Sequence, residues 1–212
     1  MQRPKFLTLA NQITLLRILL ILPFVICLLK MGHVDYGDQI RLAAIVLFII
    51  MAVSDALDGY LARRNHQQSP LGAFLDPMAD KLMITCASLI LSVSATAVEG
   101  FQLPLTVVVL IIGKDILLLS GFAVTYFLTN NIHIRPVWAG KASTFFQIVM
   151  VFSILIGPEM IRWFSFWRIL TACFWWITAF CAVLATFVYI YRGIRYIEAF
   201  DSIQNDNNPT GK

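Results

Sequence analysis

The sequence predicts an all-α integral membrane protein with six transmembrane helices and both termini on the cytoplasmic side. Hydrophobic residues make up 59% of its 212 residues and charged residues only 13%, whereas a soluble domain has roughly 25% charged residues. The apolar residues form six blocks, each near the roughly 20 residues that span a bilayer. Because hydrocarbon offers no partner for backbone amides, blocks of this length must be helical. The blocks cover residues 13–29, 42–57, 75–98, 103–128, 137–156 and 164–191.

The distribution of Lys and Arg predicts the orientation of these helices. Basic residues are concentrated at both termini and around the second and fourth connections, whereas the other connections lack them or balance them with acidic residues. Because cytoplasmic loops carry the excess of Lys and Arg, the termini and those two connections are predicted to face the cytoplasm, across a bacterial-type inner (cell) membrane. The net charge of +4 is modest and dispersed along the chain, which argues against nucleic acid as a partner.

The chain divides into one membrane domain and two short ends. Residues 1–12 are polar and basic with an aromatic residue, Phe6, and suit an interfacial segment on the membrane surface; a disordered start is an equal alternative. Residues 13–200 form the membrane domain. Residues 201–212 are polar and lack large apolar side chains after Ile203, which predicts a disordered tail.

Four aspartates stand where the second apolar block ends and the third begins, at the ends of membrane helices: Asp55, Asp58, Asp76 and Asp80. Carboxylates are costly there, so they predict a functional site. The first pair is three residues apart and the second pair four, so each pair lies on one helix face. If the two helices are antiparallel neighbours, the four carboxylates converge at the cytoplasmic surface. This cluster predicts two divalent cations, because cations relieve the repulsion and hard carboxylate oxygens select Mg2+, Mn2+ or Ca2+. Of these we expect Mg2+ or Mn2+.

Small and basic residues are interleaved with these aspartates. Ser69 is placed to cap the later helix with Pro70 as its first residue, and Gly72 then lies on the same face as the two later aspartates. Gly59 lets a ligand approach the backbone, and Arg63, one turn further on, is placed to pair with a phosphate. A set of helix caps and snorkelling charges is the structural alternative, but it does not explain the interleaving.

With these residues the chain resembles the CDP-alcohol phosphatidyltransferase family, because it matches every fixed position of that family's signature. The resemblance covers most of the chain, from residue 11 to residue 196. It implies a six-helix membrane fold, a homodimer, and transfer of the phosphatidyl group from CDP-diacylglycerol to an alcohol with release of CMP. The signature here reads Asp55-x2-Asp58-Gly59-x2-Ala62-Arg63-x8-Gly72-x3-Asp76-x3-Asp80.

The resemblance also implies a role for each motif residue. Asp55, Asp58 and Asp76 look like metal ligands, and Asp80 looks like a shared ligand and the general base that deprotonates the acceptor hydroxyl. Contacts to the CDP moiety are implied for four further residues, Gly59, Arg63, Ser69 and Gly72.

The identity of the acceptor is less sharply indicated. The motif Asn11-x2-Thr14-x2-Arg17 and the segment 72–81 resemble the glycerol-using branch, which includes phosphatidylglycerophosphate synthases and CMP-forming cardiolipin synthases. We expect glycerol 3-phosphate as the acceptor, with phosphatidylglycerol as the alternative. Serine and inositol phosphate also remain candidate acceptors, since the signature residues recognise only the donor, CDP-diacylglycerol.

Basic residues outside the signature are candidates for the acceptor site. Lys114 and Asp115 stand where phosphatidylglycerophosphate synthases tend to carry Arg-Glu followed by another Arg, and they predict a cavity-facing pair; a self-neutralising structural pair is the alternative. Arg135 and Lys141 are placed to hold an acceptor phosphate or to anchor helix ends. Cation transport, a different class of function, predicts carboxylates near the bilayer midplane and an internal repeat, and the sequence shows neither.

Overall fold

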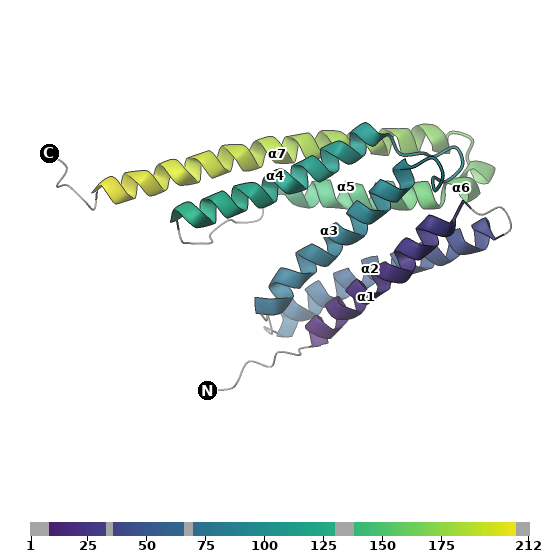
Figure 1. The fold of residues 1–212 in the computed structure, drawn as a ribbon, viewed down its shortest axis with the longest axis horizontal. Helices are drawn as coiled ribbons and strands as arrows, with labels where there is room; N and C mark the ends of the chain where they lie inside the picture. The colour runs from purple at the N-terminus through teal and green to yellow at the C-terminus, as the bar shows by residue number, and fades with distance from the viewer. Residues whose placement is uncertain (1–8, 33–35, 66–69, 130–137, 207–212) are drawn as a thin grey trace.

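The computed structural model describes residues 9–32, 36–65, 70–129 and 138–206 (Figure 1), and side chains for residues 12–32, 36–55, 78–121 and 138–195. Within those ranges all regular structure is helical. The predicted all-α class is therefore confirmed. The helices are α1 (Leu9–Lys30), α2 (Gly37–Asn65), α3 (Pro70–Ser92), α4 (Leu105–Thr129), α5 (Trp138–Leu155), α6 (Gly157–Trp163) and α7 (Trp167–Asp206).

The six long helices run back and forth between two ends of the molecule. Figure 1 shows that α1, α3 and α5 begin, and α2, α4 and α7 end, toward the same side, while the short α6 lies at the opposite side. We call the first side the motif end, because α2 ends there at Asn65 and α3 begins there at Pro70. The other side is called the α6 end.

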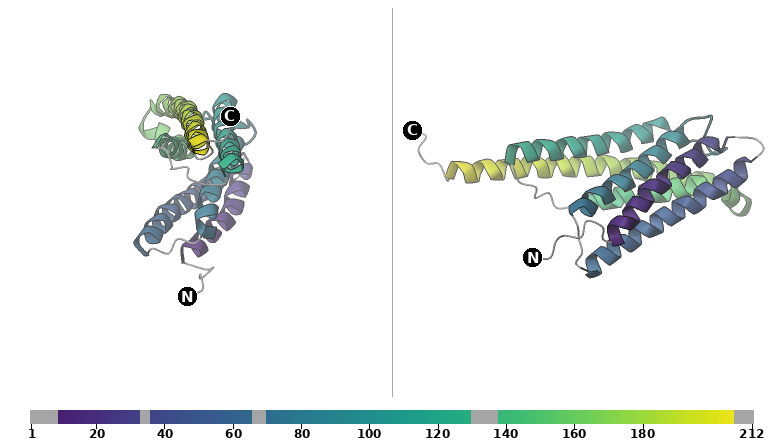
Figure 2. Two further views of the ribbon diagram at one scale, coloured as in Figure 1. Left: turned by 90° about the vertical axis from the view of Figure 1, so that its left-hand side faces the viewer. Right: turned by 60° about the horizontal axis from the view of Figure 1, so that its bottom comes forward.

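The helices form two groups that meet along the middle of the molecule (Figure 2). One group packs α1 against α2 and α3, and the other packs α7 against α4, α5 and α6. The groups are joined because α3 contacts both α4 and α5, and α2 contacts α5. Aromatic residues fill part of this junction: the Phe48 ring centroid lies 5.9 Å from that of Phe24 and 6.4 Å from that of Phe152.

The outer faces of the helices are apolar, as expected for a protein in lipid. On α1 the exposed side chains include Leu15, Leu19, Leu22 and Ile26. Among the residues with described side chains, four helical segments are long and apolar enough to cross a membrane: Gln12–Lys30, Gly37–Asp55, Trp138–Leu155 and Trp167–Arg195. The predicted membrane class is supported by these spans. For α3 and α4, only part of the side chains is described.

Several helix ends differ from the apolar blocks. α2 continues to Asn65, whereas the second apolar block ends at residue 57, so the last turns of this helix contain the polar motif. α3 ends at Ser92, before the predicted end at residue 98. There, hydroxyl groups and the returning chain take up helical carbonyls: Thr96 Oγ1 donates to Ile90 O at 2.6 Å, and the Leu103 amide donates to Leu91 O at 3.1 Å. Such bonds compete with helix continuation.

The chain after α5 also differs from the prediction. The fifth connection contains a short helix, α6, with Pro158 in its first turn, a position that proline favours. α7 is 40 residues long and continues through residues 201–206, where the sequence predicts disorder. Extending a helix that has already formed avoids the cost of nucleation and gains one hydrogen bond for each added residue, so a polar segment can continue the helix. Residues 1–8 and 207–212 lie outside the described residues.

An ionic cluster ties the start of α2 to the end of α5 and to α6. The Arg41 side chain, only 8% exposed, donates to both carboxylate oxygens of Glu159 and, at 2.9 Å, to the carbonyl oxygen of Leu155. It also donates to Asp38 at 3.0 Å. These contacts fix the α6 end and lie away from the motif aspartates at the other side of the molecule.

Candidate active site

The signature residues lie on the last turns of α2 and the first turns of α3. The helical backbone of α2 carries Asp55, Asp58, Gly59 and Arg63, and that of α3 carries Gly72, Asp76 and Asp80. The predicted helical spacing of the two aspartate pairs is therefore confirmed. α3 begins at Pro70 as predicted, while Ser69 lies outside the described residues.

The two signature aspartates with described side chains, Asp55 on α2 and Asp80 on α3, are brought together by Arg17 of α1. Arg17 Nη1 lies 2.7 Å from Asp55 Oδ1 and 4.0 Å from Asp80 Oδ1. The Arg17 side chain is 0% exposed, whereas those of Asp55 and Asp80 are 36% and 21% exposed. The guanidinium thus supports the carboxylates from inside the α1–α2–α3 group and leaves them accessible.

This geometry can be tested against the requirement for divalent ions. Both oxygens, Asp55 Oδ1 and Asp80 Oδ1, lie near the same Arg17 nitrogen. The distance between them therefore cannot exceed the sum of their two distances to that nitrogen. Ions in two-metal sites lie about 3.5–4 Å apart and bind oxygen at about 2.0–2.6 Å. This upper limit lies within the reach of a pair of ions, and the hard carboxylate oxygens suit Mg2+ or Mn2+.

The other predicted ligands do not contribute to this test. The side chains of Asp58 and Asp76 lie outside the described ones, as do those of Gly59, Arg63 and Gly72. Among the side chains that are described, no group of three or more His, Cys, Asp or Glu residues gathers. The structure thus brings together one aspartate from each motif helix, while the predicted convergence of all four carboxylates stays a prediction.

A second polar cluster joins α3, α4 and α5 next to the aspartates. Lys81, the residue after Asp80, donates from Nζ to Asp115 Oδ1 at 3.0 Å, and Lys114 Nζ lies 3.2 Å from the same oxygen. Lys114 also donates to Ser143 Oγ at 3.3 Å, and Gln147 Nε2 donates to that hydroxyl at 3.4 Å.

Burial differs sharply within this second cluster. The Lys114 side chain is 5% exposed, Asp115 14% and Lys81 35%, while Ser143 and Gln147 are buried. Lys114 and Asp115 do pair with each other, as the structural alternative expects. Asp115 also pairs with Lys81 of α3, so the two residues do not interact only with each other. They connect α4 to the helix that carries Asp80.

The remaining acceptor candidates are only partly placed. Lys141 is exposed on the first turn of α5, two residues before Ser143. Arg135 lies outside the described residues. The structure therefore groups Lys114 and Asp115 with Lys81, and shows no contact of Lys141 with them.

The sequence did not predict that Arg17 contacts the aspartates, nor that Lys81, Ser143 and Gln147 join the second cluster. In the sequence, Arg17 belongs to the motif Asn11-x2-Thr14-x2-Arg17. One signal was available: an arginine four residues inside an apolar block is costly unless a carboxylate pairs with it. For Ser143 and Gln147 the signal is their spacing of four residues, which puts both on one helix face.

Comparison with known proteins gives a consistent result. The sequence profile of the CDP-alcohol phosphatidyltransferase family matches residues 7–188. A CDP-diacylglycerol–glycerol-3-phosphate 3-phosphatidyltransferase of Pseudomonas fluorescens is 37% identical over 166 residues, which cover 77% of this chain and 78% of the relative. One of Bacillus subtilis is 34% identical over 155 residues, 70% of this chain and 76% of the relative. A human cardiolipin synthase (CMP-forming) is 28% identical over 184 residues, 79% of this chain and 58% of the relative.

Proposed function

Because the chain belongs to the CDP-alcohol phosphatidyltransferase family, we propose that it transfers the phosphatidyl group of CDP-diacylglycerol to glycerol 3-phosphate and releases CMP. The observation that carries this proposal is the meeting of Asp55 and Asp80, one from each motif helix, at a single guanidinium nitrogen of Arg17. The acceptor is proposed from the two bacterial relatives named as glycerol-3-phosphate phosphatidyltransferases, which match most of the chain.

Asp80 is the proposed general base. Its carboxylate accepts the proton of the acceptor hydroxyl as the hydroxyl oxygen attacks the phosphorus that bears the diacylglycerol. The new oxygen–phosphorus bond replaces the bond between that phosphorus and the oxygen of CMP, and CMP leaves. Asp80 is suited to this role because its side chain is partly exposed while Arg17 holds it from the buried side.

Asp55, Asp58, Asp76 and Asp80 are the proposed ligands of two divalent cations, Mg2+ or Mn2+. Bound there, such ions supply Lewis-acid stabilisation of the diphosphate charge. The donor is held by four further motif residues in this proposal, Gly59, Arg63, Ser69 and Gly72. Arg63 supplies a forked guanidinium for a phosphate, and the glycines leave room for the nucleotide.

The acceptor end of the site is proposed to lie between α3, α4 and α5. Lys114 and Asp115 are proposed to line its buried end, since Asp115 contacts α3 and Lys114 contacts α5. Lys141 and Arg135 are proposed to help hold the phosphate of an anionic acceptor through their positive charge.

We further propose that all six long helices cross the bacterial inner membrane, with both termini and the motif end in the cytoplasm. The concentration of Lys and Arg at the termini and the second and fourth connections supports this orientation. The alternating direction of the helices in Figure 1 agrees with it. A homodimer is proposed from the family resemblance alone.

A second candidate acceptor is phosphatidylglycerol, used by the CMP-forming cardiolipin synthases. It is favoured by one feature of α4: Lys114-Asp115 is not followed by the additional Arg that is typical of phosphatidylglycerophosphate synthases. The human cardiolipin synthase also matches 79% of the chain, although at 28% identity.

One assay tests the proposal and separates the two candidates. The purified full-length protein in detergent is given CDP-diacylglycerol and Mn2+ or Mg2+, and glycerol 3-phosphate, phosphatidylglycerol, inositol phosphate or serine is offered separately. CMP release with glycerol 3-phosphate alone is the expected result. CMP release with phosphatidylglycerol alone would replace the acceptor, and CMP release with none of them would refute the proposed function.

A further inference from the structure

The cluster around Asp115 carries more positive than negative charge. Lys81 and Lys114 both contact Oδ1 of Asp115, at 3.0 and 3.2 Å. Ser143 and Gln147, which complete the cluster among the described residues, bring no charge. One carboxylate therefore serves two ammonium groups. The single Asp115 carboxylate cannot neutralise both ammonium groups, so the positive charge that is left attracts an anionic ligand at the ammonium group that a ligand can reach.

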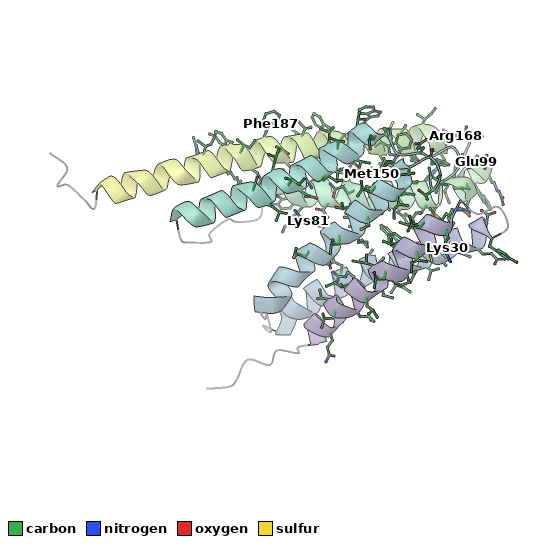
Figure 3. The ribbon with its side chains drawn as sticks, in the orientation of Figure 1. Lys30, Lys81, Glu99, Met150, Arg168 and Phe187 are labelled. Atoms are coloured by element: carbon green, nitrogen blue, oxygen red, sulfur yellow. The ribbon has the colours of Figure 1, made fainter. Side chains whose placement is uncertain are left out.

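Burial decides which ammonium group that is. The Lys114 side chain is 5% exposed and is held on two sides, by Asp115 and by Ser143. The Lys81 side chain is 35% exposed, and the contact to Asp115 uses one of its three N–H donors. Figure 3 shows Lys81 on the side of α3 that faces α4 and α5. Lys81 is therefore the accessible member of the pair.

The position of Lys81 along α3 relates it to the chemistry. It directly follows Asp80, so the two Cα atoms are about 3.8 Å apart, and neighbouring helical residues point in different directions. Asp80 points toward Arg17 of α1, and Lys81 points toward Asp115 of α4. The two side chains therefore leave α3 at adjacent positions, Asp80 beside α1 and Lys81 beside α4.

We infer that Lys81 binds the phosphate group of the acceptor. Lys114, which is buried, contacts the same carboxylate oxygen of Asp115 and so weakens the neutralisation of Lys81 by that carboxylate. This inference rests on the proposed function, because it takes Asp80 as the base. The phosphate is the monoester of glycerol 3-phosphate or the diester of phosphatidylglycerol, and the geometry requires only that it carry negative charge. Sharing Asp115 between two lysines leaves Lys81 incompletely neutralised, so that its ammonium group attracts an anion.

The test uses Lys81→Met, which keeps the length of the side chain and removes its charge, together with Lys81→Arg. Lys30→Met is the matched control, since Lys30 is an exposed lysine at the last turn of α1, at the α6 end. CMP release is measured against acceptor and against CDP-diacylglycerol. We expect Lys81→Met to raise the acceptor KM at least tenfold, Lys81→Arg to restore it to within threefold, and the donor KM to change less than threefold in both.

A second measurement needs no turnover. In the wild-type protein, reductive methylation of Lys81 is followed by mass spectrometry with and without each acceptor. We expect the acceptor to slow modification of Lys81 and to leave that of Lys30 unchanged. This measurement decides the matter if Lys81→Met does not fold.

The inference is overturned if Lys81→Met keeps an acceptor KM within twofold of the wild type, or raises both KM values alike. It is also overturned if no acceptor protects Lys81. Absence of CMP release by the wild-type protein with every acceptor would instead refute the proposed function, and the protection measurement would still report on Lys81. If only phosphatidylglycerol supports CMP release, the same KM comparison is made with that acceptor.

Discussion

Replacing Arg41 by Met should lower the thermal stability of the protein and leave its substrate binding unchanged. Arg41 joins the start of α2 to the end of α5 and to α6, and its guanidinium is almost fully buried. Met retains much of the apolar stem of the side chain, so the substitution removes the ionic contacts with little change in packing. These contacts lie at the α6 end, away from Asp55 and Asp80.

The expected loss follows from the exposure of each partner. The carbonyl of Leu155, a fully buried residue, loses a charged donor at 2.9 Å, which costs about 1–3 kcal/mol. Glu159 is 48% exposed, so after solvent screening its pair contributes about 1 kcal/mol. Asp38 is 86% exposed and contributes almost nothing. The sum is about 2–4 kcal/mol, or roughly 5–15 °C in apparent Tm for a chain of this size.

The assay is differential scanning fluorimetry in detergent at one scan rate, because membrane proteins unfold irreversibly and the apparent Tm depends on that rate. Asp38→Asn is the matched control and should shift the apparent Tm by less than about 2 °C, since it removes only an exposed charge. The KM values at low temperature should match those of the wild type. The reasoning is wrong if Arg41→Met melts with the wild type, or if Asp38→Asn is equally destabilised.

Four further predictions concern the same molecule. Hydrogen bonds from Arg41 hold the pKa of Glu159, on α6 outside the candidate spans, below its ordinary value. The pair therefore stabilises the fold above the ordinary carboxyl pKa, and this contribution is lost as pH falls through the lowered pKa; Glu159→Gln should flatten the melting profile in that acidic range. Asp80→Asn should reduce turnover by about 10²–10⁴-fold while CDP-diacylglycerol binding, measured calorimetrically with metal present, stays within threefold. EDTA should abolish CMP release, and Mn2+ should restore it; full activity in EDTA would exclude the metal proposal. Gly157→Val should destabilise the packing at the start of α6, because a Cβ at that position lies 2.5 Å from Cε2 of Phe101, whose ring is fully buried, and an unchanged melting temperature would contradict this packing.

The helix order was predictable from hydrophobicity, and the helix ends were not. Apolar blocks report where lipid surrounds a helix, so they miss helical turns that extend into the polar region, such as those of α2 up to Asn65. Apolar blocks also extend beyond the true helix end where polar side chains bond to the last helical carbonyls, as Thr96 does after α3 ends at Ser92. The short α6 was missed because a single turn or two between long blocks has no periodic signal of its own.

The candidate site was predictable where its residues repeat at helical spacing. The spacing of the aspartates predicted that α2 and α3 bring carboxylates together, and Asp55 and Asp80 do converge. The partner that joins them, Arg17, comes from a third helix, and its position depends on how α1 rotates and crosses the other two. The same holds for Asp115, which meets Lys81 only because α4 packs beside α3. Contacts of this kind are set by tertiary packing, which spacing along one chain segment does not encode.

The contact of Arg17 with Asp55 and Asp80 has a consequence for how the protein is made. A newly inserted helix hairpin with several ionised carboxylates near lipid would resist assembly, because like charges repel and each group loses water. The permanent cation Arg17 lies on α1, which precedes α2 and α3 in the chain, so it is synthesised before the two helices that carry the aspartates. The three helices can therefore associate during synthesis, because the guanidinium of Arg17 already offsets part of the repulsion between the carboxylates.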